Sequence, residues 1–317
     1  MEKITKLDQA QKRWVNVELR SLLSSSALAV GAGTPTDSGV AWTVPTEAPN
    51  PIKLAGGIPD PGTLPVKELT EALEQVLLNT PEEALNYGGV KGFEGLCLAL
   101  ASRQSRIEKL PLNPENFIVN SGAAGGIDNI CDAFLEPGDV VIIEGPSFSG
   151  SVRTFKGHMA EVVQVPMDEN GLIVEELKDQ IIRAKKSGRR VKLLYTIPDF
   201  HNPTGTNLEF NRRSELIDLC SKHNVLIVED SAYSEIFFDN DYMPSLFSIA
   251  QGEGVLKVGT FSKIIATGLR TGWVQGRADF IEALCRVRYD MGNSPLIQLS
   301  LIHISEPTRP RLISYAV

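Results

Sequence analysis

The sequence predicts an α/β fold in which a mostly parallel central sheet is covered by helices on both faces. Short, continuously apolar segments, such as residues 139–146 and 191–198, alternate with segments whose apolar residues recur at helical spacing. Strands that are apolar at nearly every position are typical of a parallel sheet buried on both sides. With 317 residues, 42% of them hydrophobic, the chain is long enough to bury such a core.

The predicted elements follow one another in a regular order. A helical stretch near residues 14–23 comes first, then a passage rich in Ser, Gly, Thr and Pro over 24–51, and then a helix over 66–77 behind the breaker run 59–62. From residue 117 onward strand, turn and helix repeat, with strands over 117–120, 139–146, 160–167, 191–198, 224–230 and 255–263, and helices over 127–135, 174–184, 208–223 and 279–289. We therefore expect an N-terminal arm at residues 1–53 and a large domain at 54–299.

Composition and charge argue against several classes of protein. The net charge of -8 is spread along the chain without a basic stripe, so we expect no nucleic-acid partner. No apolar run is long enough to span a bilayer, and the N-terminal segment lacks the apolar core of a signal peptide, so we expect a cytoplasmic protein without membrane contact. Cys131, Cys220 and Cys285 fall within apolar helical patterns, which favours reduced core cysteines over disulfides or a metal site.

In a sheet of this kind, ligands bind beyond the carboxyl ends of the strands. That rule directs attention to the residues that follow each predicted strand. These are Ser121-Gly122, Gly145-Pro146, Asn202-Pro203, Asp230 to Tyr233, and Ser262-Lys263.

Two of these loops are ambiguous by themselves. The small residues of SGAAGG (121–126) would let backbone N–H groups approach an anion at a helix N-terminus, but a plain tight turn is an equal alternative. The HNPTG run (201–205) is a common turn signal. At the carboxyl end of a central strand, however, its Asn202 offers an amide side chain to a ligand.

The two later loops carry the groups best suited to chemistry. In EDSAY (229–233), Asp230 either caps the next turn or faces a cationic nitrogen, with the Tyr233 hydroxyl nearby. Lys263 follows a buried strand and precedes another apolar stretch, which is unusual for a surface lysine. A partly desolvated lysine has a lowered pKa and forms Schiff bases at neutral pH. Arg270, with the hydroxyls of Thr260 and Ser262, makes a phosphate clamp plausible.

Taken in order, the motifs SGAAG, NPTG, EDSAY and SK…GLRTGW resemble those of the class I/II, fold-type-I pyridoxal-phosphate aminotransferases. The segments 54–65 and 85–96 are similar to the branch that contains 2-aminoadipate, kynurenine and aromatic aminotransferases. The resemblance runs from about Leu54 to Gln298. Each motif alone is weak, but four of them in family order at family-like spacing are specific.

The resemblance implies an enzyme that uses pyridoxal 5′-phosphate to move an amino group from an amino acid of the aromatic, kynurenine or 2-aminoadipate type to a 2-oxo acid such as 2-oxoglutarate. Lys263 would hold the cofactor covalently and later move the proton at the substrate Cα. Asp230 would pair with the pyridinium nitrogen and keep it protonated, so that the ring accepts carbanion charge. Asn202 and Tyr233 would hydrogen-bond the 3-oxygen of the ring.

The resemblance also assigns residues around the rest of the cofactor. Phe148 would stack on the ring, and Gly57, with the arm before it, would line the substrate pocket. Tyr87 would reach the phosphate of a neighbouring subunit because family sites form at a dimer interface, so a homodimer is expected. The residues expected around the phosphate lie in two loops: Ser121, Gly122, Ala123, Ala124, Thr260, Ser262 and Arg270. His201 stands where many relatives have Gln.

The C-terminal part departs from the family pattern. Relatives continue into a small domain whose arginine grips the substrate α-carboxylate, and no residue here can be assigned to it. Arg286 and Arg288, on the helix predicted over 279–289, are expected to face solvent. From residue 300 the helix and strand periods are lost, and the tail resembles translated adapter sequence. We therefore expect residues 300–317 to be non-native and the small domain to be largely missing.

The sequence leaves other functions open. Another fold-type-I enzyme, such as a β-lyase, would use the same cofactor residues, because the pocket decides the outcome. A truncated chain that binds the cofactor but is inactive is a further alternative. A regulator with this domain behind a helix-turn-helix is disfavoured, because the first fifty residues are too few and too weakly basic. A nucleotide-binding oxidoreductase would need a clean glycine fingerprint, which is missing after the first strand.

Overall fold

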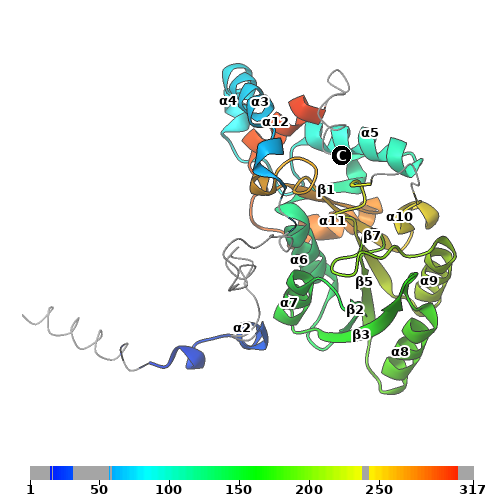
Figure 1. Cartoon of the computed structure of the whole chain (residues 1–317). Coiled ribbons are helices and arrows are strands. Elements are labelled where there is room, and N and C mark those ends of the chain that lie inside the picture. The colour runs from blue at the N-terminus through cyan, green and yellow to red at the C-terminus, as the bar shows by residue number, and fades with distance from the viewer. Residues whose placement is uncertain (1–14, 16, 31–56, 58, 238–242, 306–317) are drawn as a thin grey trace, which may run out of the picture.

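The computed structural model describes residues 15, 17–30, 57, 59–237 and 243–305, and it contains the predicted sheet (Figure 1). The eight strands lie in the order β1-β8-β7-β6-β5-β2-β3-β4. Neighbours among β3, β2, β5, β6 and β7 are parallel, whereas β8 is antiparallel to both β1 and β7, and β4 is antiparallel to β3. The strands are β1 (Phe117–Asn120), β2 (Val140–Gly145), β3 (Glu161–Asp168), β4 (Gly171–Leu172), β5 (Val191–Thr196), β6 (Leu226–Asp230), β7 (Val255–Thr260) and β8 (Gly272–Gln275).

Helices cover both faces of the sheet because its strands are apolar on both sides. Successive side chains of a strand point to opposite faces, so that Ile143 and Val258 pack on one face while Ile142 and Leu194 pack on the other. The first face is covered by α6 (Gly122–Phe134), α7 (Ser149–Gly157) and α11 (Ala278–Val287). The second is covered by α5 (Glu94–Glu108), α8 (Val174–Lys186), α9 (Phe210–His223) and α10 (Leu246–Ile249).

The remaining helices lie at the margins of this layered body. Beyond the β1 end of the sheet, α12 (Pro295–Ser305) packs against α3 (Val66–Asn79), α4 (Pro81–Ala84) and α5 (Figure 1). The helix α2 (Ser25–Val30) packs against α7. The short 3-10 helices are η1 (Leu19–Ser21), η2 (Pro61–Thr63), η3 (Pro114–Asn116) and η4 (Thr267–Leu269). Among the described residues, no helix has both the length and the apolar character needed to cross a bilayer.

The α/β fold with a mostly parallel sheet is confirmed, but several elements were not predicted. The sequence assigned no helix to α4, α5, α7 or α10 and no strand to β4 or β8. Of these, α7 is mostly polar and small, and β4 has only two residues. Residues 25–30 form α2, although no helix was predicted within the Ser-, Gly-, Thr- and Pro-rich passage over 24–51. The rest of that passage, from residue 31, lies outside the described residues. The helix predicted over 14–23 is wrong for residues 17–23, where the only helical element is the short 3-10 helix η1, and Trp14 lies outside the described residues.

The C-terminal part differs from expectation in two ways. The chain remains helical beyond residue 300 although the sequence period is lost, because α12 continues to Ser305 and buries Leu301 and Ile304. The expectation that residues 300–317 are non-native stays a prediction. Residues 306–317 lie outside the described part of the chain. Arg286 is exposed as predicted, but Arg288 follows the end of α11, its side chain is only 6% exposed, and it donates to the carbonyl of Val90.

Candidate active site

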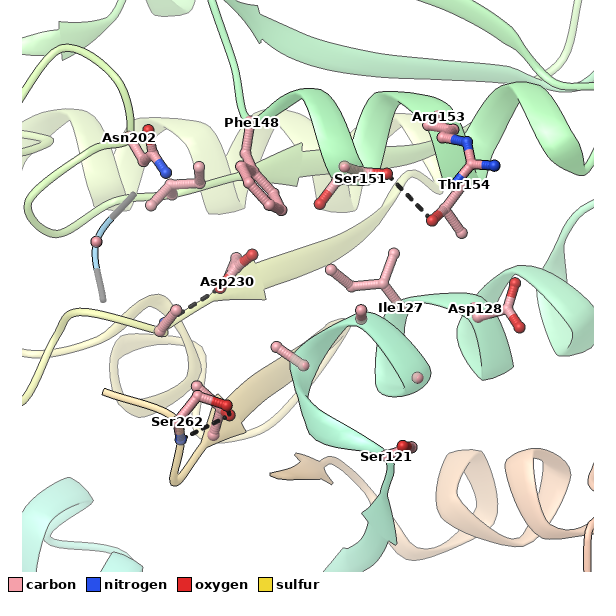
Figure 2. Close-up of a pocket in the computed structure, with 18 of the residues that line it drawn as sticks. Ser121, Ile127, Asp128, Phe148, Ser151, Arg153, Thr154, Asn202, Asp230 and Ser262 are labelled. Carbon is pink, nitrogen blue, oxygen red and sulfur yellow. Dashed lines mark hydrogen bonds between the residues drawn. The ribbon is translucent and has the colours of Figure 1, made fainter. Parts of the chain in front are cut away.

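One cavity of about 1440 Å³ opens where the parallel strands end and α6 and α7 begin. Figure 2 shows Asn202, Phe148 and Asp230 reaching this space from three different elements. The cavity brings together twelve of the residues that the sequence singled out: Gly57, Ser121, Ala123, Ala124, Phe148, Asn202, Asp230, Tyr233, Thr260, Ser262, Lys263 and Arg270. The carboxyl ends of neighbouring parallel strands share one edge of the sheet, which explains why loops far apart in the chain meet here.

Lys263 lies in the loop after β7 and is half-buried. Its Nζ donates to the carbonyl oxygen of Gly57 at 2.8 Å and lies 5.6 Å from the centre of the Tyr233 ring. Burial, followed by the positive charge of Arg270, lowers the pKa of Lys263, and the negative charge of Asp230 opposes that shift. The neutral amine, which is the nucleophilic form, is therefore more populated at a given pH than in an ordinary lysine.

Asp230 is the last residue of β6, and it is only 5% exposed. The Tyr195 hydroxyl donates to its Oδ2 at 2.6 Å, and the backbone N–H of Ala232 donates to its Oδ1 at 3.1 Å. Burial raises the pKa of Asp230, while these two hydrogen bonds favour the ionised form and act against the shift. A buried carboxylate at the edge of a cavity is suited to binding a cationic group, because a charge partner offsets its desolvation.

A cradle for an anion forms where α6 begins, next to the loop that carries Arg270. A guanidinium nitrogen of Arg270 lies so close to Gly122 that a Cβ at this glycine would meet it at 3.0 Å. Gly122 has a φ of +69°, which favours glycine. The buried hydroxyls of Thr260 and Ser262 lie 3.0 Å apart on the same side of the cavity. Helix N–H groups, a guanidinium and two hydroxyls are a donor set that fits a phosphate.

The Asn202 loop rests on buried polar groups. The peptide bond between Asn202 and Pro203 is cis, and the residue before Asn202 is His201, which is only 2% exposed. The His201 Nε2 lies 3.1 Å from Oε2 of Glu144, although the alignment is too poor for a hydrogen bond. Burial raises the pKa of Tyr233, as does the charge of Asp230, whereas a hydrogen bond with Asn202 lowers it.

Two of the predicted residues do not line the cavity. Gly122 is buried just behind the lining at the start of α6, where it contacts Arg270. Tyr87 lies outside the cavity, beyond α4, and is 80% exposed. The role expected for Tyr87 involves a second subunit, so it stays a prediction.

Sequence reasoning missed the groups that lie behind Asp230. Tyr195 is within β5 and fully buried, and its hydroxyl also accepts a hydrogen bond from Ser151 of α7 at 3.0 Å. Glu144, near the end of β2, is 1% exposed and accepts a hydrogen bond from the N–H of Ile197 at 2.9 Å. A polar residue inside an otherwise apolar strand was the available signal for both.

Comparison with protein families identifies one that covers most of the chain. The family described as aminotransferase class I and II matches residues 49–300. The matched range contains every residue that was singled out for the site.

Two curated relatives span much of the chain. An aromatic-amino-acid aminotransferase from Thermococcus litoralis is 36% identical over 238 residues, which is 75% of this chain and 57% of that protein. A 2-aminoadipate transaminase from Thermus thermophilus is 29% identical over 290 residues, which is 90% of this chain and 70% of the relative. The chain thus spans less than two thirds of the length of the first of these relatives.

A solved structure reproduces the fold. The α-aminoadipate aminotransferase LysN from Thermus thermophilus, complexed with N-(5′-phosphopyridoxyl)-L-leucine, superposes with a TM-score of 0.83 at 25% sequence identity. The superposition covers 95% of this chain and 73% of that one.

Proposed function

The chain belongs to the class I and II aminotransferases, and on that premise we propose that it moves an amino group from an amino acid to a 2-oxo acid with pyridoxal 5′-phosphate as its cofactor. The observation that carries the proposal is the convergence of three groups in one cavity. These are the Lys263 amine with its lowered pKa, the buried Asp230 carboxylate, and the anion cradle formed by Gly122 and Arg270.

The residues present fit this cofactor at each of its polar groups. Its phosphate matches the cradle, where a guanidinium lies directly over the start of α6. Its ring nitrogen matches Asp230, whose buried carboxylate needs a cationic partner. Its 3-oxygen matches Asn202 and Tyr233, and Phe148 is placed to cover the ring face. When bound, the cofactor supplies an electron sink for the charge that develops at the substrate Cα.

The side chains of the chain itself then have separate tasks. Lys263 Nζ holds the cofactor and moves the proton at the substrate Cα. Asp230 keeps a proton on the ring nitrogen by presenting a negative charge to it. Arg270 and the two hydroxyls of Thr260 and Ser262 fix the orientation of the phosphate, so that the reacting atoms stay aligned with the amine.

The names of the relatives support a class of amino donor. One relative is named for aromatic amino acids and the other for 2-aminoadipate. We therefore assign this chain amino donors with a large aromatic or an acidic side chain. We also infer a homodimer in which Tyr87 contacts the cofactor of the partner subunit, because its exposed side chain is free to reach a neighbouring molecule. The domain division into an arm (1–53) and a large domain (54–299) is part of the same proposal.

The absorption spectrum of the purified protein with added pyridoxal 5′-phosphate tests the proposal. We expect a visible band in the native chain and none in Lys263→Ala. Addition of an aromatic amino acid or 2-aminoadipate should bleach the band, and a 2-oxo acid should restore it. A band that bleaches without release of the corresponding 2-oxo acid would contradict amino transfer, and the absence of any lysine-dependent band would contradict cofactor binding.

A further inference from the structure

We infer that Tyr195, backed by Ser151, is a positioning residue that keeps Asp230 ionised and correctly oriented at the floor of the cofactor site. This inference rests on the proposed function and adds to it Tyr195, which does not line the cavity, and Ser151, which lines it. It is carried by a line of three side chains that runs from α7 through β5 to the end of β6.

The register of the sheet brings Tyr195 and Asp230 together. Tyr195 of β5 is paired with Val228 of β6, so both side chains lie on the face covered by α6 and α7. Asp230 is two residues further along β6 and therefore points to the same face. The Phe155 ring of α7 packs edge-on against the Tyr195 ring, with the ring centres 5.4 Å apart, and this contact fixes the direction of the hydroxyl.

Which group donates in each of these two hydrogen bonds depends on the charge of Asp230. An ionised carboxylate only accepts, so Tyr195 gives it its single hydroxyl proton at 2.6 Å, and Ser151 donates to the Tyr195 oxygen at 3.0 Å. Both donors are buried, Tyr195 within the sheet and Ser151 at the cavity wall. If Asp230 were neutral, it could donate to Tyr195 instead, but a hydrogen bond to an uncharged carboxyl group is weaker than one to a carboxylate. The arrangement therefore favours the charged carboxylate.

The other groups that face Asp230 do not provide this effect by themselves. Glu144, near the end of β2, disfavours the negative charge, whereas His201, after β5, favours it. Lys263, after β7, also faces the carboxylate, and the remaining close donor is the backbone of Ala232. Tyr195 is thus the side-chain donor that offsets the burial of Asp230 within the described part of the chain.

The test follows the titration of Asp230 in the full chain without cofactor, by ¹³C NMR of aspartate-labelled protein, with the resonance assigned through Asp230→Asn. We expect Tyr195→Phe to raise the pH midpoint of Asp230 by about one unit, since a hydrogen bond to an ion is worth at least that much. Ser151→Ala should move it in the same direction by less. Tyr289→Phe, at a 93% exposed tyrosine, is the matched control and should leave it unchanged.

The cofactor supplies a second, separate readout. In Tyr195→Phe we expect about a tenfold weaker affinity for pyridoxal 5′-phosphate, with the loss growing as the pH falls. Equal Asp230 midpoints in Tyr195→Phe and Tyr289→Phe would overturn the inference, whatever the cofactor does. The NMR result does not depend on the proposed function, because it needs no cofactor. A shifted midpoint in a chain whose native form shows no lysine-dependent band would thus support the inference and refute the function.

Discussion

The Nζ of Lys263 donates a hydrogen bond to the carbonyl oxygen of Gly57 at 2.8 Å, across 206 positions of sequence. The contact joins the loop after β7 to the segment that precedes η2. A Cβ at Gly57 would lie 3.0 Å from the Tyr233 hydroxyl and 3.5 Å from Nζ. Gly57 therefore closes the cavity directly beside the amine and keeps Lys263 away from bulk water, which is one reason for its lowered pKa.

The lowered pKa of Lys263 predicts reaction with amine reagents at unusually low pH. In protein without cofactor, we expect trinitrobenzenesulfonate to modify Lys263 with a pH midpoint below the ordinary lysine value of 10.5. Arg270→Gln should raise that midpoint, because the Arg270 charge disfavours the ammonium form. Peptide mass spectrometry measures the rate at each pH. Arg270→Lys keeps the charge and is the control, and identical midpoints in the glutamine variant and the native chain would contradict the assignment.

The cradle at the start of α6 predicts that Gly122→Ala weakens cofactor binding. The new Cβ would meet the Arg270 guanidinium at 3.0 Å and displace it. We expect about a tenfold loss of affinity for pyridoxal 5′-phosphate, measured by fluorescence titration. Gly138→Ala is a matched control, since Gly138 also has a positive φ, of +89°, but has no atom within 4 Å of its Cβ position. If the two variants lost cofactor affinity equally, backbone strain alone would explain the loss, and the contact with Arg270 would not.

The sequence predicted best those parts of the molecule that depend on local pattern. Buried strands such as β2 are apolar throughout, so their positions follow from composition, and the rule for carboxyl ends then placed Asn202, Asp230 and Lys263 at one edge. The loop residues of the site were predictable because a strand end is a local feature. Their partners were not, because Tyr195 faces Asp230 only through the register of β5 with β6.

A long-range contact also explains why the exposure expected for Arg288 was wrong. The helical period continues through Arg288, which made a solvent-facing side chain the natural expectation. In the structure the backbone leaves the helix at that residue, and the guanidinium reaches the carbonyl oxygens of Val90 and Val119. No local pattern encodes a contact between residues almost two hundred positions apart. The helix α12 was missed because its apolar residues are not confined to one face and show no amphipathic period.

We predict that Arg213 stabilises both the fold and the loop that carries Asn202. The Arg213 side chain is fully buried and donates to the carbonyl oxygens of Pro198, Leu208 and Pro244 at 3.1, 2.9 and 3.0 Å. Two of these carbonyls flank the loop that carries Asn202. Arg213→Ala should therefore destabilise the chain by about 3 kcal/mol or more and also weaken cofactor binding.

Urea unfolding and cofactor titration measure the two effects of Arg213→Ala. The neighbouring Arg212→Ala is the control, because Arg212 is only half-buried and pairs with Asp168 away from the cavity. We expect Arg212→Ala to have a smaller effect on unfolding and none on cofactor affinity. If both variants lose affinity equally, α9 as a whole supports the site, and the specific role of Arg213 is wrong.

Because Glu229 is buried, we predict that the free energy of unfolding falls as the pH rises towards neutrality. Glu229 is fully buried in β6 and accepts hydrogen bonds from the N–H groups of Leu246 and Phe247, and burial raises its pKa from 4.5 to about 7. Between these values the folded chain retains a proton that the unfolded chain has released. The free energy of unfolding should therefore decrease by about 3 kcal/mol from pH 4.5 to 7 through this group, and then level off.

Glu229→Gln isolates this contribution, because the amide does not titrate. We expect the variant to be less stable than the native chain at pH 5, since it disturbs the two backbone donors, and the difference to shrink by about 2.4 kcal/mol at pH 7.5. Urea unfolding at both pH values measures the change. Glu282→Gln, at an exposed glutamate of α11, controls for the loss of one carboxyl group and should show no such change. A stability difference that is the same at both pH values would mean that Glu229 is already ionised in the folded chain at pH 5, with its charge held by the amides of α10 and by Lys257.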